Sequence, residues 1–140
     1  MLCIFIFPAG CGTQTMESLI LQEQTSPEGM ATNDFIAHKA ENQSELKKKW
    51  NDYNLTKDLP DVEWQDNYLL LLATYESSSC PHKIIGEDID KVDNMISYQL
   101  KEVKKDCTAD ASPTTMVMKI DRTEVEISKV QLGSKTADIK

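Results

Sequence analysis

Cys11 carries the most specific chemical signal in the sequence, because it follows an apolar opening over residues 1–10 that ends in two small residues. This pattern is typical of a bacterial lipoprotein signal, which is cleaved before the Cys so that its thiol can be acylated with palmitate-type chains. The sequence therefore predicts a truncated signal segment at 1–10 and lipidation of Cys11. No basic residue precedes Lys39, and Pro8 stands where a larger aliphatic residue is usual. We expect the true start codon of such a signal to lie upstream.

An alternative interpretation of the same stretch is a short buried strand with Cys3 and Cys11 as core thiols. The apolar stretch is too short to span a bilayer, and the sequence becomes polar directly after Cys11. We therefore favour the lipoprotein interpretation. It predicts that the rest of the chain lies on the extracytoplasmic face of the cell membrane and is held there by lipid.

Cys80 and Cys107 remain when the first two of the four cysteines are assigned to the signal and to the lipid. An even pair of cysteines in an oxidising compartment predicts a disulfide, and closing a loop of this length stabilises a fold by roughly 3–4 kcal/mol. One alternative is a metal site formed by both cysteines, His82 and either Asp106 or Asp110. The spacing lacks the C-x-x-C pattern usual for zinc. A redox couple is a further alternative for the same pair.

Nucleophilic catalysis would have to use one of the two histidines, and His82 lies close in sequence to the serines at 77–79. The sequence contains no G-x-S-x-G elbow and no glycine-rich phosphate loop. Carboxylates are so abundant that no particular pair is singled out for glycoside hydrolysis. We therefore predict no catalytic residue, no metal and no cofactor, and we expect that the protein is not an enzyme.

Acidic residues dominate the charge of the chain, with 23 Asp and Glu against 15 Lys and Arg and a net charge of −8. Such a surface disfavours nucleic acid and anionic lipid headgroups as partners. Four acidic residues crowd one predicted turn and are candidate Ca²⁺ ligands: Glu87, Asp88, Asp90 and Asp93. They lack the glycine and the terminal Glu of an EF-hand loop. A solvated acidic turn is the simpler interpretation.

The elements that position these residues fit one domain, because 140 residues suffice for one modest core. Leu46, Trp50 and Tyr53 lie on one face of a helix predicted over residues 44–53, with Asn42 or Ser44 as its cap. An unbroken apolar run at residues 68–75 predicts a central strand that is covered on both faces.

Shorter strands surround this central strand in the prediction. They are expected at residues 34–38, 84–89, 95–100 and 115–120, with Leu19–Leu21 as a candidate first strand. The second and third of these form an antiparallel hairpin. The last is joined by a tight turn at 121–124 to an alternating segment that contains Val125 and Ile127. The fold class predicted is α+β, one helix packed on a mainly antiparallel sheet.

Two motifs carry a resemblance to a known group of proteins. They are Glu-Ser-Ser-Ser-Cys-Pro at 76–81 and Cys-Thr-Ala-Asp-Ala-Ser-Pro at 107–113, followed by a Met-Val-Met-Lys-Ile strand. Residues 35–130 resemble small uncharacterised lipoproteins of spore-forming, Bacillus-type Gram-positive bacteria. They are also loosely similar to the protease-complex-associated polypeptide domain, in which a helix packs on an antiparallel sheet. The resemblance implies this fold and location, and it brings no catalytic residues.

The predicted organisation is the signal segment at 1–10, a lipid-anchored tether and loop at 11–33, an extracytoplasmic domain at 34–132 and a polar C-terminal tail at 133–140. We expect a membrane-anchored lipoprotein that acts as an interaction or accessory module. Its expected partners are the membrane, through the lipid on Cys11, and an envelope protein, with no nucleic acid. The alternative is a cation-dependent binding protein or hydrolase of cell-envelope material that uses the acidic hairpin.

Overall fold

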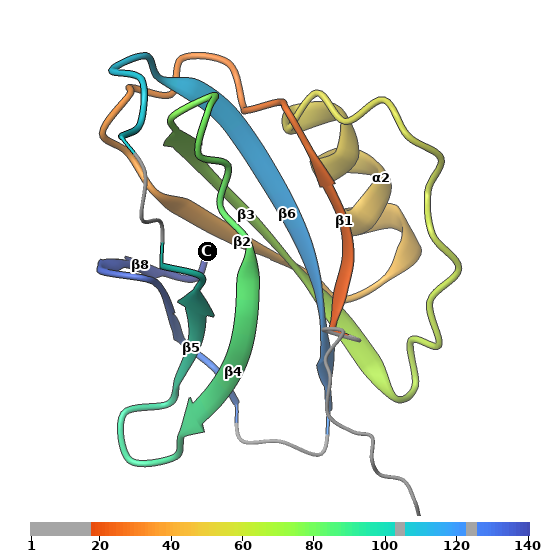
Figure 1. Ribbon diagram of the computed structural model, residues 1–140. Coiled ribbons are helices and arrows are strands. Elements are labelled where there is room, and N and C mark those ends of the chain that lie inside the picture. The colour runs from red at the N-terminus through yellow and green to blue at the C-terminus, as the bar shows by residue number, and fades with distance from the viewer. Residues whose placement is uncertain (1–17, 103–105, 123–125) are drawn as a thin grey trace, which may run out of the picture.

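The computed structural model describes residues 18–102, 106–122 and 126–140. This part of the chain is mainly β, with one short helix and two four-stranded sheets. Figure 1 shows three layers: the helix α2, a first sheet against which it lies, and a second sheet on the other side of the first. No helix in the described ranges is long and apolar enough to cross a membrane.

The first sheet is antiparallel and has the strand order β1-β6-β3-β2. Its strands are β1 (Leu19–Glu23), β2 (Ile36–Ala40), β3 (Asn67–Glu76) and β6 (Ser112–Asp121). β3 and β6 pair along their whole length, from Asn67 opposite Asp121 to Glu76 opposite Ser112. β3 is an inner strand and is buried along almost all of its length, which confirms the prediction from its apolar run.

Two side-chain hydrogen bonds fix the start of the helix α2 (Gln43–Asp52). The Asn42 side chain accepts the N–H of Glu45 at 2.9 Å, and the Glu45 carboxylate accepts the N–H of Glu41 at 2.8 Å. The first bond satisfies a donor that the first turn leaves without a partner, and the second ties the residue before the cap to the helix. Asn42 is thus the cap, one of the two candidates that the sequence offers.

The predicted apolar face of α2 packs on the first sheet. Leu46, Trp50 and Tyr53 are buried, as their helical spacing indicates. They form one cluster with side chains of β3 and β6: Leu69, Leu71, Ala73 and Val117. The opposite face of the first sheet is covered by the second sheet, so β3 and β6 are buried from both sides.

The second sheet is mixed and has the strand order β4-β5-β7-β8. Its strands are β4 (Ile84–Asp90), β5 (Met95–Leu100), β7 (Lys129–Leu132) and β8 (Lys135–Asp138). β4 and β5 form the predicted antiparallel hairpin, whereas β5 and β7 run parallel. The core between the two sheets contains inward-facing residues of both, among them Leu70, Leu72, Ile96, Tyr98, Met116, Met118 and Val130.

The structure corrects three expectations about the strands. The strands form two sheets rather than one. The chain leaving β6 does not turn back to pair with it, because the next described strand, β7, joins the other sheet beside β5. Val125 lies outside the described residues. The predicted polar tail at 133–140 contains β8, whose Ala137 packs on the core between the sheets while Thr136 and Asp138 are exposed.

The two sheets are joined differently along their two long sides. On one side, main-chain hydrogen bonds connect β2 to the end of the chain, from Lys39 N–H to the Lys140 oxygen at 2.9 Å and from Lys140 N–H to the Ala37 oxygen at 3.0 Å. On the other side β1 faces β4, and the described hydrogen bonds there come from side chains. We call this second side the open seam.

Candidate functional site

The predicted disulfide between Cys80 and Cys107 is present, with a Cα–Cα distance of 5.7 Å. Cys80 lies in the loop that follows β3, and Cys107 lies in the segment that leads to β6. Both cysteines are therefore at the same end of the sandwich. Because cross-linked sulfurs are not thiolates, this pairing contradicts the alternative metal site that would use both as ligands.

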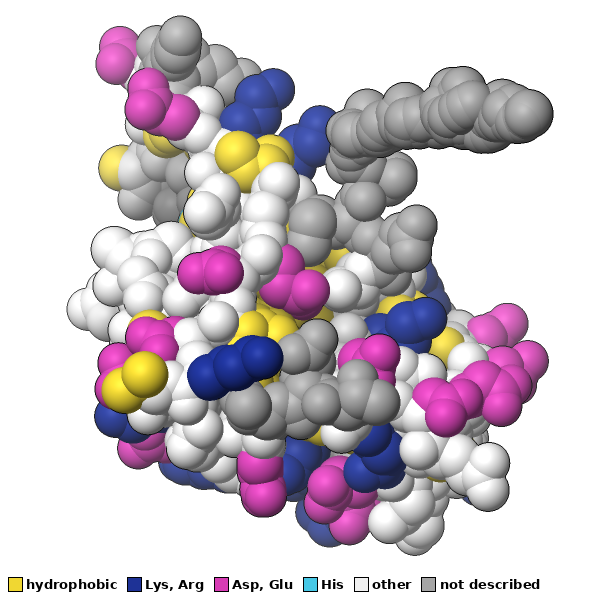
Figure 2. All heavy atoms as spheres, turned by 90° about the horizontal axis from the view of Figure 1, so that it is seen from below, with side chains coloured by type: hydrophobic (Ala, Val, Ile, Leu, Met, Phe, Trp, Pro, Cys, Tyr) yellow, Lys and Arg dark blue, Asp and Glu magenta, His cyan; other side chains and the backbone are white. Residues whose placement is uncertain are grey.

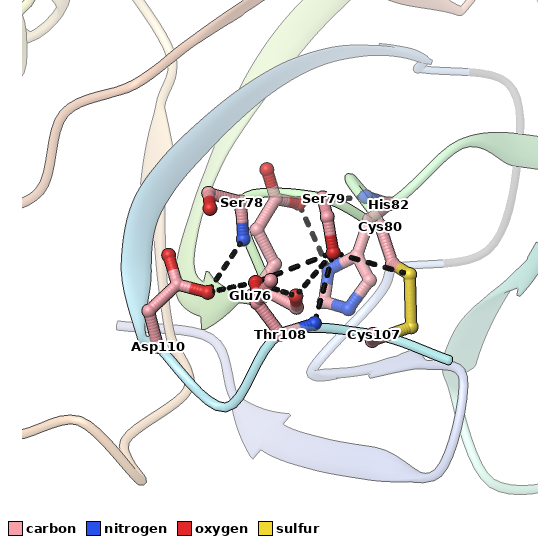
Figure 3. The surroundings of a disulfide bond; sticks show 9 residues. Glu76, Ser78, Ser79, Cys80, His82, Cys107, Thr108 and Asp110 are labelled. Atoms are coloured by element: carbon pink, nitrogen blue, oxygen red, sulfur yellow. Dashed lines mark hydrogen bonds and ion pairs between the residues drawn. A yellow bond between two sulfur atoms is a disulfide. The ribbon is translucent and has the colours of Figure 1, made fainter. Parts of the chain in front are cut away.

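A network of hydroxyl groups reinforces the disulfide (Figure 3). The Ser77 and Ser79 hydroxyls lie 2.9 and 3.2 Å from the Thr108 hydroxyl, and the Thr108 N–H donates to the Ser79 oxygen at 2.9 Å. The Asp110 carboxylate accepts from Ser78 N–H and from the Thr108 hydroxyl. Hydrogen bonds to Ser78 and then Thr108 lower the pKa of Asp110. We call residues 76–82 and 107–110 together the disulfide corner.

The structure does not form the nucleophile–base pair that the sequence suggested between His82 and a nearby serine. The hydroxyls of Ser77 and Ser79 are directed to each other and to Thr108, and no described hydrogen bond joins either of them to His82. The His82 imidazole is turned instead towards Glu76, with 3.5 Å between its Nδ1 and the Glu76 Oε1 atom. This arrangement activates no serine.

Glu76 is the buried titratable residue of the corner, with a side chain that is 2% exposed. Its Oε1 atom accepts the main-chain N–H of His82 at 2.7 Å, while the buried Nδ1 atom of the His82 ring has no hydrogen-bond partner among the described residues. Burial raises the pKa of Glu76, against the opposing effect of this hydrogen bond. Burial also lowers the pKa of His82, and the charge of Lys135 adds to the effect. The environment thus favours the neutral form of both groups.

Further polar side chains complete a layer that closes this end of the core. The Lys135 ammonium donates to the Thr74 hydroxyl at 2.7 Å, so β8 is tied to β3 across the two sheets. The Gln22 amide donates to the His82 carbonyl at 3.1 Å and to the Thr114 hydroxyl at 3.3 Å. The layer links both sheets and the loop that carries Cys80. It joins strands to one another and presents no activated nucleophile.

Sequence reasoning missed Glu76, although a signal for it was present. Residues that alternate along a strand point to the same face. Leu70, Leu72, Thr74 and Glu76 are such a set, and Leu70 and Leu72 belong to the core between the sheets. Continuing this alternation past Leu72 to Thr74 and then to Glu76 directs the Glu76 carboxyl towards the space between the two sheets.

The acidic hairpin residues do not converge. Asp90 accepts hydrogen bonds from the N–H groups of Val92 and Asp93 at 2.9 and 3.2 Å, which shapes the turn between β4 and β5. Glu87 and Asp88 are consecutive in β4 and therefore point to opposite faces. Among the described residues, no group of three or more His, Cys, Asp and Glu side chains is placed to hold a metal ion. The four candidate ligands at this turn are therefore not gathered into one group among the described residues.

Two of the predicted features lie outside the described residues. Cys11, the expected lipidation site, and Cys3 both belong to residues 1–17. The structure therefore tests the disulfide and the surrounding loops, and the lipid anchor remains a sequence prediction.

Comparisons of the chain with models of protein families, with curated proteins and with solved structures found no match.

Proposed function

We propose that this chain is a lipid-anchored interaction or accessory module on the extracytoplasmic face of the cell membrane, attached through Cys11. The observation that carries the proposal is the Cys80–Cys107 disulfide. Disulfides persist in exported proteins and are rare where thioredoxin and glutathione keep thiols reduced. A structural bridge in the domain and a lipidated cysteine before it belong to the same compartment.

The sequence resemblance is part of this proposal. The motifs shared with small lipoproteins of Bacillus-type bacteria contain both cysteines of the bridge, so the resemblance and the disulfide support the same location. We also retain the α+β assignment of the domain, since its helix covers one face of the antiparallel sheet. The looser similarity to the protease-complex-associated polypeptide domain suggests an envelope protein as the partner.

The disulfide corner is the surface that we assign to this partner. Residues 106–110 are exposed, and the bridge and the hydroxyl network tie Cys107, Thr108 and Asp110 to the loop that follows β3. A surface that is ordered before binding loses less conformational entropy when a partner binds. The edge strands on the open seam are less suited to pair with a partner strand, because both β1 and β4 carry a register shift. Such bulges protect sheet edges from strand addition.

The proposal is tested on protein isolated from the membrane fraction of its native host after cross-linking in the cells. A peptide mass map without reducing agent should contain acylated Cys11, a linked Cys80–Cys107 peptide and a recurring cross-linked partner. Asp106→Lys, directly before the corner, should reduce cross-linking to that partner, whereas Asp93→Lys, in the exposed turn at the other end of β4, should not. Unmodified Cys11 together with free thiols at Cys80 and Cys107 would contradict the proposal.

A further inference from the structure

A groove lined by lysines lies on the side of the molecule opposite the open seam, between α2, β2 and the residues that follow β8. It has a volume of about 380 Å³ and is lined by Lys39, Glu41, Glu45, Lys48, Lys49 and Lys140. The whole chain has a net charge of −8, and Figure 2 shows acidic and basic side chains interspersed on one end of the molecule. The side chains of the groove are therefore a local excess of positive charge on an acidic protein.

The groove lysines come together from three separate segments of the fold. Lys48 and Lys49 lie in α2, and Lys39 lies in β2, which α2 contacts. Main-chain hydrogen bonds to β2 hold Lys140 beside them. The Lys39 ammonium lies over the ring of Tyr68, 5.5 Å from its centre, and this contact limits its freedom. Tertiary structure therefore gathers the positive charges of the groove.

The two glutamates of the groove are occupied by other groups. The Glu41 Oε2 atom lies 3.7 Å from Nη1 of Arg122 and 3.8 Å from Nζ of Lys39. The Glu45 carboxylate accepts the Glu41 N–H at 2.8 Å. Among the described residues, neither glutamate forms an ion pair with the lysines of α2 or with Lys140.

Lys49 and Lys140 therefore lack a counter-charge. Lys48 pairs with Asp52 at 3.1 Å, whereas no described residue forms an ion pair with Lys49 or with Lys140. Lys49 is also half-buried. Taking an ammonium group partly out of water without a counter-charge costs free energy. An anion bound in the groove would reduce this cost.

His38, the residue before Lys39, responds to the charge of the groove. Its Nδ1 atom lies 2.7 Å from the Tyr53 hydroxyl, which donates its proton to the Leu71 carbonyl at 3.1 Å. Because Tyr53 has one proton to donate, the imidazole must donate from Nδ1. The uncharged ring therefore carries its lone pair at Nε2 and can take up a second proton there.

Three of the four groove lysines act on this one imidazole. Burial lowers the pKa of His38, and the charges of Lys49, Lys140 and Lys48 lower it further, against the opposing charge of Asp52. These lysines belong to α2 and to the residues after β8, yet their charges converge at His38. A single anion at this place would be attracted by all three.

We propose that this groove binds a small phosphate ester, whose phosphate group lies between the ammonium groups of Lys48, Lys49 and Lys140. A phosphate presents several acceptor oxygens on one centre, and lysine binds it as a point charge. A carboxylate is matched better by an arginine fork, but the Arg122 guanidinium is already bonded to two main-chain oxygens. The volume of about 380 Å³ is within the range of small-molecule sites. A free ester and a phospholipid headgroup share this chemistry.

Titration of the full chain with glycerol 3-phosphate tests the free ester, at about 0.15 M salt so that distant charges are screened. The two histidines of the sequence are the NMR reporters. Bound phosphate offsets the lysine charges, so the pKa of His38 should rise, whereas the pKa of His82 in the disulfide corner should not change. We expect a Kd on the order of 1 mM and no binding of glycerol, which lacks the charge.

Vesicles distinguish the lipid headgroup from the free ester. If glycerol 3-phosphate does not bind, but the chain sediments more with phosphatidylglycerol than with phosphatidylcholine vesicles and Lys49→Gln abolishes this difference, the ligand is the headgroup. Binding of glycerol 3-phosphate in solution identifies the free ester. The absence of both would overturn the proposal.

Two lysines of α2 separate the groove from a general effect of charge. Lys49→Gln should weaken binding about fivefold, because it removes one ammonium group from the phosphate. Lys47→Gln removes the same charge outside the groove, on a different face of α2, and should leave the Kd unchanged. Unchanged His82 signals verify that both variants fold. The proposal is also overturned if the dianion succinate binds as tightly as glycerol 3-phosphate, if saturation leaves the pKa of His38 unchanged, or if both variants weaken binding equally.

Discussion

Removing the Cys80–Cys107 bridge should destabilise the protein by an amount that follows from the loop it closes. The two cysteines are 27 residues apart. On the chain-entropy estimate, closing a loop of this length removes about 12 cal/mol/K from the unfolded chain, or about 3.5 kcal/mol at 25 °C. The native state keeps the hydroxyl contacts of Ser77 and Ser79 with Thr108, and of the contacts that these serines make only the one between the Ser79 hydroxyl and the Cys80 sulfur, at 3.8 Å, involves the bridge. Most of the loss in a Cys80→Ser/Cys107→Ser variant should therefore arise in the unfolded state.

Equilibrium unfolding in urea measures this loss directly. For 140 residues, about 3.5 kcal/mol corresponds to a decrease in Tm of about 12 °C. Dithiothreitol should destabilise the wild type by the same amount and should not affect the variant. A loss below about 1 kcal/mol would refute the loop-entropy argument. It would also remove the main reason to regard the bridge as structural rather than as a redox couple.

The remaining predictions concern a buried carboxyl group and two glycines. Burial raises the folded-state pKa of Glu76 above its ordinary value of 4.5, so its contribution to stability is present at low pH and is lost as pH rises through the folded pKa. Glu76→Gln keeps an acceptor for the main-chain N–H of His82. Its free energy of unfolding, measured by urea titration, should therefore increase relative to that of the wild type as the pH rises from about 4 to about 7. A difference between the two proteins that does not change with pH would contradict this sign. Gly133→Ala combines a φ of +60° with a Cβ placed 3.0 Å from Leu100 Cδ1, whereas Gly29→Ala has a φ of +82° and open space. We expect losses of about 2 and about 1 kcal/mol respectively by thermal unfolding, and equal losses would show that the Leu100 contact has no effect.

The sequence predicted those elements whose pattern is complete within a short stretch. The helix follows from Leu46, Trp50 and Tyr53 at helical spacing, and β3 follows from an apolar run too long for a half-exposed strand. The parallel pairing of β5 with β7 brings Met95 opposite Lys129. No local periodicity encodes a contact between such distant residues, so the division into two sheets could not be predicted. β8 was missed because its residues are mostly polar and only Ala137 packs on the core between the sheets.

The disulfide was predictable for a different reason, namely that the cysteines form an even pair once a compartment is assumed. The neighbouring chemistry was harder to predict, because residue type alone is misleading there. Glu76 is acidic and would be expected at the surface, yet strand alternation buries it. His82 is close to three serines in sequence, but hydrogen bonds to Thr108 direct two of their hydroxyls away from it. Proximity along a chain says little about which side chains meet.

The position of β6 in the chain decides when the molecule becomes able to fold. β6 is the hydrogen-bonding partner of both β1 and β3, yet it follows five of the other described strands. A growing chain that ends before Ser112 therefore leaves β1, the earliest of those strands, without its partner. β6 also separates β5 from β7, so no continuous segment encodes either sheet. Pairing between such distant strands is slow to form. Folding must wait until nearly the whole chain is available, and a fragment cut anywhere between the strands is not expected to fold alone.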